Sequence, residues 1–220
     1  SVTLTRPDRE QLIKNTTVHM PGGLLGKLTG MTLCPAANAS AGTCPDSTLV
    51  GSALAHVGAG GSVAAFPGRV YLTAPPNPGD VAGLSIVIPA VAGPLNFGNV
   101  VQVAGIKLRQ SDFGLDVTTT DFPRFQQGIP VLLRDVTITV DKKGFLLNPT
   151  GCSDRAFTAS FNGFEGSTAS SSAPYKATGC DKLDFRPALN TKVADAGSNK
   201  KGGHPPFSTV LTVPSGDAAN

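Results

Sequence analysis

The residues of this chain that could act in acid–base or nucleophilic catalysis are few and far apart in the sequence. Only three histidines occur, at His19, His56 and His204. Serine and aspartate are plentiful, so a Ser-His-Asp arrangement is one hypothesis for a hydrolase, but the Gly-x-Ser-x-Gly elbow is absent. His19 lies in an alternating segment, His56 near the end of an expected strand and His204 in a Gly/Pro loop. We therefore expect no catalytic residues and no enzyme.

Sugar chemistry is also poorly supported by the residue types. A glycosidase needs two carboxylates across a cleft, and sugar sites usually offer aromatic faces. Here glutamate occurs only at Glu10 and Glu165, tryptophan is absent, and the only tyrosines are Tyr71 and Tyr175. An exposed groove lined by Tyr71, Tyr175 or His19 would instead indicate a binding module.

Two groups of aspartates could offer oxygen ligands to calcium. The first is Asp112, Asp116 and Asp121, and the second is Asp181 and Asp184. Neither has the Asp-x-Asp-x-Asp spacing of a dedicated calcium loop. Because aspartate commonly caps turns, we favour that role and expect no metal site, with calcium near residues 112–121 as the alternative.

One glycine-rich segment, residues 21–28, is close to a phosphate-binding loop. Pro21 stands where that motif has its first glycine, Leu28 stands where it has Ser or Thr, and no strong helix follows. We interpret the segment as a turn after a strand and expect no cofactor.

The four cysteines fall into two local groups, Cys34 with Cys44 and Cys152 with Cys180. There is no Cys-x-x-Cys pair and the histidines are distant, so the pattern does not suit zinc. The number of cysteines is even, and each has one cysteine near it in the sequence. This pattern predicts two disulfides, Cys34–Cys44 and Cys152–Cys180, formed in an oxidising compartment. The other pairings would cross-link distant segments. We therefore expect a secreted or cell-surface protein whose export signal lies outside these 220 residues.

The composition excludes several kinds of partner. The net charge is only +3, and the densest basic stretch, Lys192 to Lys201, has no interleaved aromatic residues, so nucleic-acid binding is not expected. No apolar run reaches 18 residues, so no membrane span is expected. The 26 glycines and 18 prolines interrupt any long helix, while 40% apolar residues are enough for a core.

Short strand patterns with turn residues between them recur along the whole chain, and no long segment has helical periodicity. The expected strands are 2–6, 15–20, 49–57, 69–74, 84–91, 99–109, 113–120, 130–141, 157–161, 175–178 and 207–213. The almost continuous apolar run at 84–91 predicts a strand buried on both faces. One short helix is expected near residues 35–41, because Pro35 suits a first turn, alanines follow, and Gly42 suits a left-handed cap. The sequence therefore predicts an all-β fold, either one β-sandwich or two stacked sandwiches, with one short helix.

The two ends of the chain resemble each other. Residues 208–214 repeat the pattern of residues 1–7 at an offset of 207, with identical Ser, Leu, Thr and Pro. Such an echo suggests a unit of a tandem array, with residues 1–207 as one repeat and residues 208–220 as the opening strand of the next. A weaker echo relates residues 12–18 to 132–138 at an offset of 120 and suggests two halves, about 1–110 and 111–207.

Several segments of the sequence also resemble a family of large secreted tandem-repeat proteins of actinobacteria. They are Val18–Gly26, the Cys34–Pro45 box with Val50-Gly51 after it, Arg69–Leu72, Asn148–Cys152 and Ala177–Pro187. The match spans nearly the whole chain, and both cysteine boxes come in the same order. The resemblance implies export, disulfides and tandem repetition, and it implies no activity or site residues.

Together these features predict a structural repeat module of an extracellular, cell-surface or filament-forming protein. Its partners would be neighbouring copies joined head to tail, and an unpaired strand edge would also allow growth by strand addition. The alternative is a binding or adhesion module for a cell-envelope polymer or a host surface.

Overall fold

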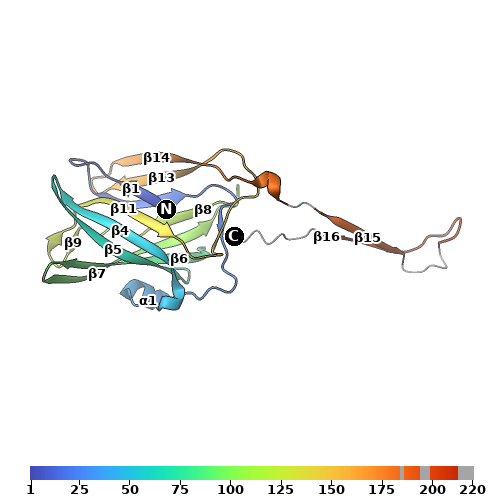
Figure 1. Ribbon diagram of the computed structural model, residues 1–220, viewed down its shortest axis with the longest axis horizontal. Helices are drawn as coiled ribbons and strands as arrows, with labels where there is room; N and C mark the ends of the chain where they lie inside the picture. Colours follow the sequence, from blue (N-terminus) through green and yellow to red (C-terminus); the bar gives the residue numbers. More distant parts are fainter. Residues whose placement is uncertain (184–185, 194–198, 213–220) are drawn as a thin grey trace. The chain divides into compact units, whose positions relative to one another are not determined.

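The computed structural model describes residues 1–183, 186–193 and 199–212, and the chain divides into two compact units. Unit 1 is Ser1–Ala177 and unit 2 is Thr178–Asn220. The prediction of an all-β fold with one short helix is confirmed (Figure 1). The prediction of two disulfides is confirmed as well. The repeat boundary at residue 207 and the two halves rest on the sequence echoes, and they stay predictions.

Unit 1 is built on a single ten-stranded sheet in which every neighbouring pair is antiparallel. The sheet curls around its own interior, so the two layers expected of a sandwich belong to one continuous sheet (Figure 1). The strands, in order across the sheet, are β1 (Val2–Thr5), β11 (Leu133–Val140), β4 (Leu49–Ala59), β5 (Ser62–Thr73), β6 (Ala82–Ala92), β7 (Leu95–Leu108), β8 (Leu115–Thr119), β2 (Ile13–His19), β13 (Arg155–Gly163) and β14 (Thr168–Tyr175).

Short elements complete unit 1. The two-stranded pairs are β3 (Leu25–Gly26) with β12 (Leu146–Leu147) and β9 (Phe125–Gln126) with β10 (Ile129–Pro130). The helix α1 spans Ala36–Ala41, and a single 3₁₀ turn, Asp46–Thr48, leads into β4. Pro35 precedes the helix and Gly42 ends it at φ 68°, as the sequence predicts.

The core fills one end of the curled sheet. Because side chains alternate between the two faces of a strand, the interior face receives every second residue. The buried cluster consists of Val50, Ala53, Val70, Leu72, Ala82, Ile86, Ile106, Leu115 and Phe145.

Strand β6 is buried on both faces in its middle, as its apolar run predicts. Ser85, Ile86 and Val87 are all buried. Ile86 faces the core, whereas the outer face is covered by α1, where Ser85 Oγ donates to the carbonyl of Ala39 at 2.8 Å. The short helix therefore closes the outer face of the sheet at this point.

The strand expected at residues 175–178 is wrong in position. The structure has β14 at Thr168–Tyr175 instead, paired with β13 along its full length. The sequence of β14 is Thr-Ala-Ser-Ser-Ser-Ala-Pro-Tyr, which has little apolar alternation. Its position is therefore set by its pairing with β13 rather than by its own pattern. Strand β15 (Ala188–Val193) was not expected at all.

Unit 2 contains a 3₁₀ turn, Cys180–Lys182, and a two-stranded hairpin. The hairpin pairs β15 with β16 (Phe207–Thr212) in antiparallel register, with Leu189 opposite Leu211 and Val193 opposite Phe207. The expected strand at 207–213 is thus present in its described part. Val213 and the rest of 213–220 lie outside the described residues.

Candidate functional site

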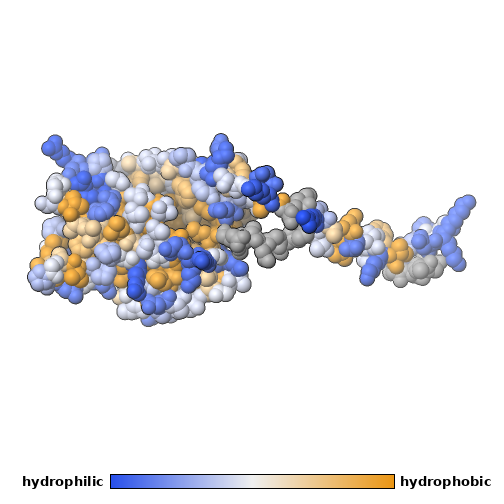
Figure 2. All heavy atoms as spheres, in the orientation of Figure 1, coloured by the Kyte–Doolittle hydropathy of each residue, from blue (hydrophilic) through white to orange (hydrophobic). Residues whose placement is uncertain are grey.

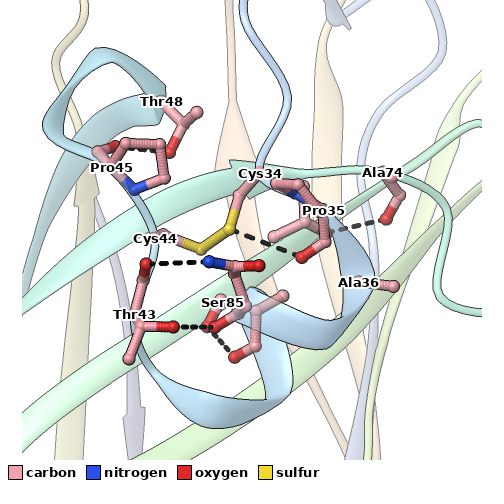
Figure 3. Close-up of a disulfide and its surroundings, with 12 residues drawn as sticks. Cys34, Pro35, Ala36, Thr43, Cys44, Pro45, Thr48, Ala74 and Ser85 are labelled. Atoms are coloured by element: carbon pink, nitrogen blue, oxygen red, sulfur yellow. Dashed lines mark hydrogen bonds between the residues drawn. A yellow bond between two sulfur atoms is a disulfide. The ribbon is translucent and has the colours of Figure 1, made fainter.

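The cysteine box holds the helix α1 against the sheet (Figure 3). Cys34 and Cys44 form a disulfide across ten residues, and Cys34 is completely buried. The backbone of Cys34 also bonds to β5 and the residue after it, accepting from Ala74 N and donating to Leu72 O. Closing a loop of this length is worth about 2–3 kcal/mol of unfolding free energy. The box is therefore structural, and Cys152 and Cys180 are disulfide-bonded as well.

Unit 1 also contains an apolar cavity inside the curled sheet. Its volume is about 290 Å³. Interior side chains of neighbouring strands form its floor, among them Leu4, Ala55, Phe66 and Val136. Residues of the segment 122–131, which includes β9 and β10, line it as well. A cavity of this size lies at the lower limit of small-molecule sites.

The polar residues of the cavity wall are Gln102, Thr119 and Gln126. Thr119 exchanges hydrogen bonds with the backbone of Thr16, and Gln126 Nε2 donates to the carbonyl of Phe97 at 2.7 Å. Gln102 is buried, and among the described residues its Oε1 has no hydrogen-bond partner. Gln102 therefore carries one unpaired acceptor that is buried behind the apolar wall.

A second, polar cleft of about 420 Å³ contains His19, Arg109, Asp112 and Arg155. His19 on β2 lies opposite Asp116 on β8, and its Nδ1 is 2.8 Å from the Asp116 carboxylate. Arg109 Nε and both its terminal nitrogens are engaged, by the carboxylates of Asp112 and Asp116 and by the carbonyl of Met20. Arg109, Asp112 and Asp116 thus neutralise one another, whereas Arg155 donates to the carbonyl of Gly22 and its Nε has no hydrogen-bond partner among the described residues.

These contacts shift the acidity of three groups. The Arg109 guanidinium lowers the pKa of Asp112 to about 2, with help from the backbone N–H of Gly114. Burial raises the pKa of Asp116, but hydrogen bonds from His19 and Arg109 outweigh burial and leave it below its usual value. The pKa of Arg109 is raised, chiefly by its bond to Asp112. All three groups are therefore charged at neutral pH, so the ion pairs of Arg109 with Asp112 and Asp116 are present there.

The residues of a catalytic triad are not brought together in the described part of the chain. His56 repeats the arrangement of His19, with its Nδ1 2.7 Å from the carboxylate of Asp135 on the neighbouring strand β11. The hydrogen-bond partner of each of these two histidines is an aspartate. His204 is exposed in the loop between β15 and β16. Both His–Asp pairs are cross-strand contacts of the sheet.

The two tyrosines do not line one groove with His19, as a binding module of the expected kind would require. Tyr71 on β5 is buried, whereas Tyr175 on β14 packs edge-on against Phe157 and donates to the side chain of Asn148. His19 lines the polar cleft without either of them.

The aspartates of the first group have separate partners. Asp112 accepts from the backbone N–H of Gly114 in a turn and from Arg109, whereas Asp121 accepts from Asn15. Across the described residues, no three His, Cys, Asp or Glu side chains converge as metal ligands. Asp181 lies in the 3₁₀ turn of unit 2, and Asp184 lies outside the described residues.

The glycine-rich segment 21–28 is a turn between two strands. β2 ends at His19, Gly23 adopts φ 84°, and β3 follows at Leu25. With no helix after it, the segment has no helical N-terminus to bind a phosphate.

Two strand edges of the sheet have no neighbour in the described structure. β1 and β14 are the first and last strands of the sheet order. Residues from both line one cleft of about 520 Å³, among them Thr5 and Arg6 at the end of β1 and Ser170 and Ser171 of β14. Such edges are where further strands can pair.

The hairpin of unit 2 has one apolar face. Residues opposite each other in an antiparallel pair point to the same side. Leu189, Leu211, Val193 and Phe207 therefore share a face, and they are 66, 65, 41 and 71% exposed. The hydrophobic residues of the hairpin are visible along it in Figure 2. The sequence analysis missed this face because the partner strand β15 was not expected.

The fold and cavity define an all-β, disulfide-bonded protein built on one curled antiparallel sheet. No family model, curated protein or solved structure matches the chain. In the part of the chain that the structure describes, no helix has the length and apolar character of a membrane span.

Proposed function

We propose that this chain is a structural repeat module of an extracellular or cell-surface protein whose neighbouring copies join head to tail. The observation that carries the proposal is the correspondence between β1 and β16. The two are related by the 207-residue offset of the repeated pattern, and both are strands over their described equivalent residues. β16 would then be the opening strand of the following unit.

The faces of the two strands also correspond. The offset matches Val2 with Thr209 and Leu4 with Leu211. Leu4 faces the interior, where it lines the cavity and lies opposite Val136 of β11. Leu211 lies on the apolar face of the hairpin. The exposed apolar face of β16 is thus the one that β1 turns inward.

Exposure supplies the driving force for docking. Phe207 and Leu211 are 71 and 65% exposed. Fully burying a side chain of this kind is worth about 1.5–3 kcal/mol, and a two-stranded hairpin alone is at best marginally stable in water. A following unit that took up β16 as its first strand would bury this face.

Two disulfides favour an oxidising, extracellular location. A binding module for a cell-envelope polymer or a host surface is the second candidate, and the polar cleft that His19 lines is the observation in its favour. Because Arg109 of that cleft is already paired with Asp112, and His19 with Asp116, we place the repeat module first.

A tandem fusion tests the proposal. Residue 220 corresponds to residue 13, so a chain in which residues 1–220 continue directly into residues 14–220 keeps the register and removes β1 of the second unit. If β16 replaces β1, the second sheet folds and its Tm stays within a few degrees of that of the parent chain. A difference of 1 kcal/mol corresponds to about 2–4 °C for a domain of this size. Calorimetry and circular dichroism would measure both transitions.

Leu211→Lys and Val210→Lys form a matched pair for this fusion. The two residues are adjacent and 65 and 58% exposed, but they lie on opposite faces of β16. Leu211→Lys should destabilise the second unit, because Leu211 would occupy the interior place of Leu4, whereas Val210→Lys should have little effect. An unfolded second unit in the parent fusion, or equal effects of the two substitutions, would rule out the array and favour the binding module.

A further inference from the structure

The last strand of the curled sheet has exposed residues on its interior side. Residues opposite each other in an antiparallel pair share a face of the sheet. Phe161 on β13 lies between the buried Thr16 of β2 and Ala169 of β14, so all three face the interior. Ala159, two residues before Phe161, also faces the interior and is buried, whereas its partner Ser171 on β14 is exposed, as is Ala169. The interior face of the sheet is therefore exposed at β14.

The cleft of about 520 Å³ lies beside this exposed face. Thr5 at the end of β1 lines it from one edge of the sheet, and residues 168–171 at the start of β14 line it from the other. Because all neighbours among the ten strands are antiparallel, β1 and β14 run in opposite directions. A strand that paired with β1 in antiparallel orientation would thus run parallel to β14, and both edges could bond to it.

Strand β15 is paired with the strand that would bring it to this cleft. β15 and β16 are antiparallel over six residue pairs. The next step rests on the proposed function, in which β16 takes the place of β1 in the following copy. Since β11 occupies one side of that place, β15 would lie on the other side, along the cleft.

The backbone of β16 can bond to two neighbours at once. Backbone groups of alternate residues in an antiparallel strand point to opposite sides. Arg6 N donates to a carbonyl of β11, so Leu4, two residues earlier, also directs its backbone groups towards β11. The hydroxyls of Thr191 and Thr209 are 3.4 Å apart, a close approach typical of a pair without backbone hydrogen bonds. Leu211, two residues after Thr209, then points away from β15 and can bond to β11 as Leu4 does.

The side chains of β15 alternate in the way that this position requires. Leu189 lies opposite Leu211, which matches the inward-facing Leu4, so Leu189 would face the interior together with Val193. Both are exposed in the hairpin. Asn190 and Lys192 would face solvent. Apolar residues on one face and polar residues on the other are typical of a strand with one buried face.

We propose that the cleft between β1 and β14 is a docking surface for β15 of the preceding copy, which adds an eleventh strand to the ten-stranded sheet. The added strand is antiparallel to the strand in the place of β1 and parallel to β14. Ala188 lies opposite Thr212, which the 207-residue offset matches with Thr5. β15 therefore begins at the end of the cleft where β14 also begins, at Thr168.

The tandem fusion tests this docking through a matched pair of substitutions in β15 of its first copy. Leu189→Lys should lower the Tm of the second unit by about 4 °C or more, because Leu189 would lose its buried place. Asn190→Lys, at the adjacent exposed residue on the other face, should leave that Tm unchanged. Equal effects of the two, with Leu211→Lys still destabilising, would overturn the docking of β15 and leave the array intact. A second unit that does not fold in the parent fusion would instead refute the array on which the docking rests.

A disulfide between copies tests where β15 lies. Thr191→Cys in the first copy and Ser171→Cys in the second place both thiols on the inward face of neighbouring strands. Mild oxidation should join them, as a non-reducing peptide map of the fusion would show. Lys192→Cys with the same Ser171→Cys is the control, because its side chain lies on the other face of β15, and it should join in much lower yield. No bond in the first pair, or equal yields in the two, would show that β15 does not occupy the cleft beside β14.

Discussion

At the scale of single residues, Arg109 organises one end of the sheet. It follows β7, and its guanidinium bonds to the carbonyl of Met20 just after β2 and to both Asp112 and Asp116. Gly114 lies against this guanidinium so closely that an added Cβ would be 1.9 Å from Nη2. One cation thus ties the β7–β8 turn to the end of β2.

The contact between Arg109 and Asp112 predicts a loss of stability in acid. The folded pKa of Asp112 is about 2, below its ordinary value of 3.8, so the unfolded chain binds the proton more readily. The stabilisation is therefore present above about pH 4 and is lost as the pH falls towards 2. Asp112→Asn should flatten the decrease in Tm between pH 4 and pH 2, measured by differential scanning fluorimetry.

Asp154→Asn is the control for that experiment. Asp154 pairs with Lys176 on the surface, and its side chain is 86% exposed. Its substitution should leave the acid limb of the Tm profile nearly unchanged, since exposed ion pairs contribute little. An acid limb as steep in Asp112→Asn as in the parent would contradict the assignment.

At the scale of elements, close approach between strands explains one glycine that the sequence leaves unexplained. Gly51 on β4 lies opposite Val140 of β11, next to an irregularity in its pairing with β5. A Cβ at Gly51 would be 1.9 Å from the carbonyl oxygen of Thr139. Because that atom belongs to the backbone, the two strands would have to separate.

Gly51→Ala should therefore lower the free energy of unfolding by about 1–3 kcal/mol, the usual cost of forcing atoms into a packed site. Urea denaturation measures this loss. Gly61→Ala, in the turn between β4 and β5, is the control, because a Cβ there would meet nothing within 4 Å. Equal midpoints for the two variants would show that β4 and β11 are looser than described.

At the scale of the whole molecule, the two units differ in how much of their apolar surface is buried. Unit 1 has an extensive core, including Val50, Val70 and Leu72 at 1% exposure or less. The hairpin of unit 2 has only exposed residues in both strands. Backbone hydrogen bonds without buried neighbours open readily.

Hydrogen exchange should reveal this difference. In the chain of 220 residues, amides of β15 and β16 should exchange much faster than those of β5 and β6. In the tandem fusion, β16 should become protected, because it would gain a neighbouring unit. Equal protection of β16 in both chains would indicate that the hairpin is stable without a partner.

The local patterns of the sequence determined much of the fold. Alternation in residues 136–140 predicted β11, the apolar run at 84–91 predicted a strand buried on both faces, and Pro35 and Gly42 set the limits of α1. These features were predictable because they depend on residues within one segment. Alternation and apolar runs indicate which faces of a strand are buried, and proline and glycine restrict or widen the backbone angles at their own positions. The cysteine spacing likewise indicated the two disulfides.

Only the tertiary structure decided which distant segments meet. Strand β14 was misplaced because its serine-rich sequence gains its order from β13. The cavity was invisible in the sequence, since Leu4, Phe66 and Val136 become neighbours only when the sheet curls. Gln102 resembles any polar strand residue until the surrounding wall is known. The pairing of strands that are far apart in the sequence depends on how the whole chain packs. The pattern within a single segment indicates only the local structure of that segment.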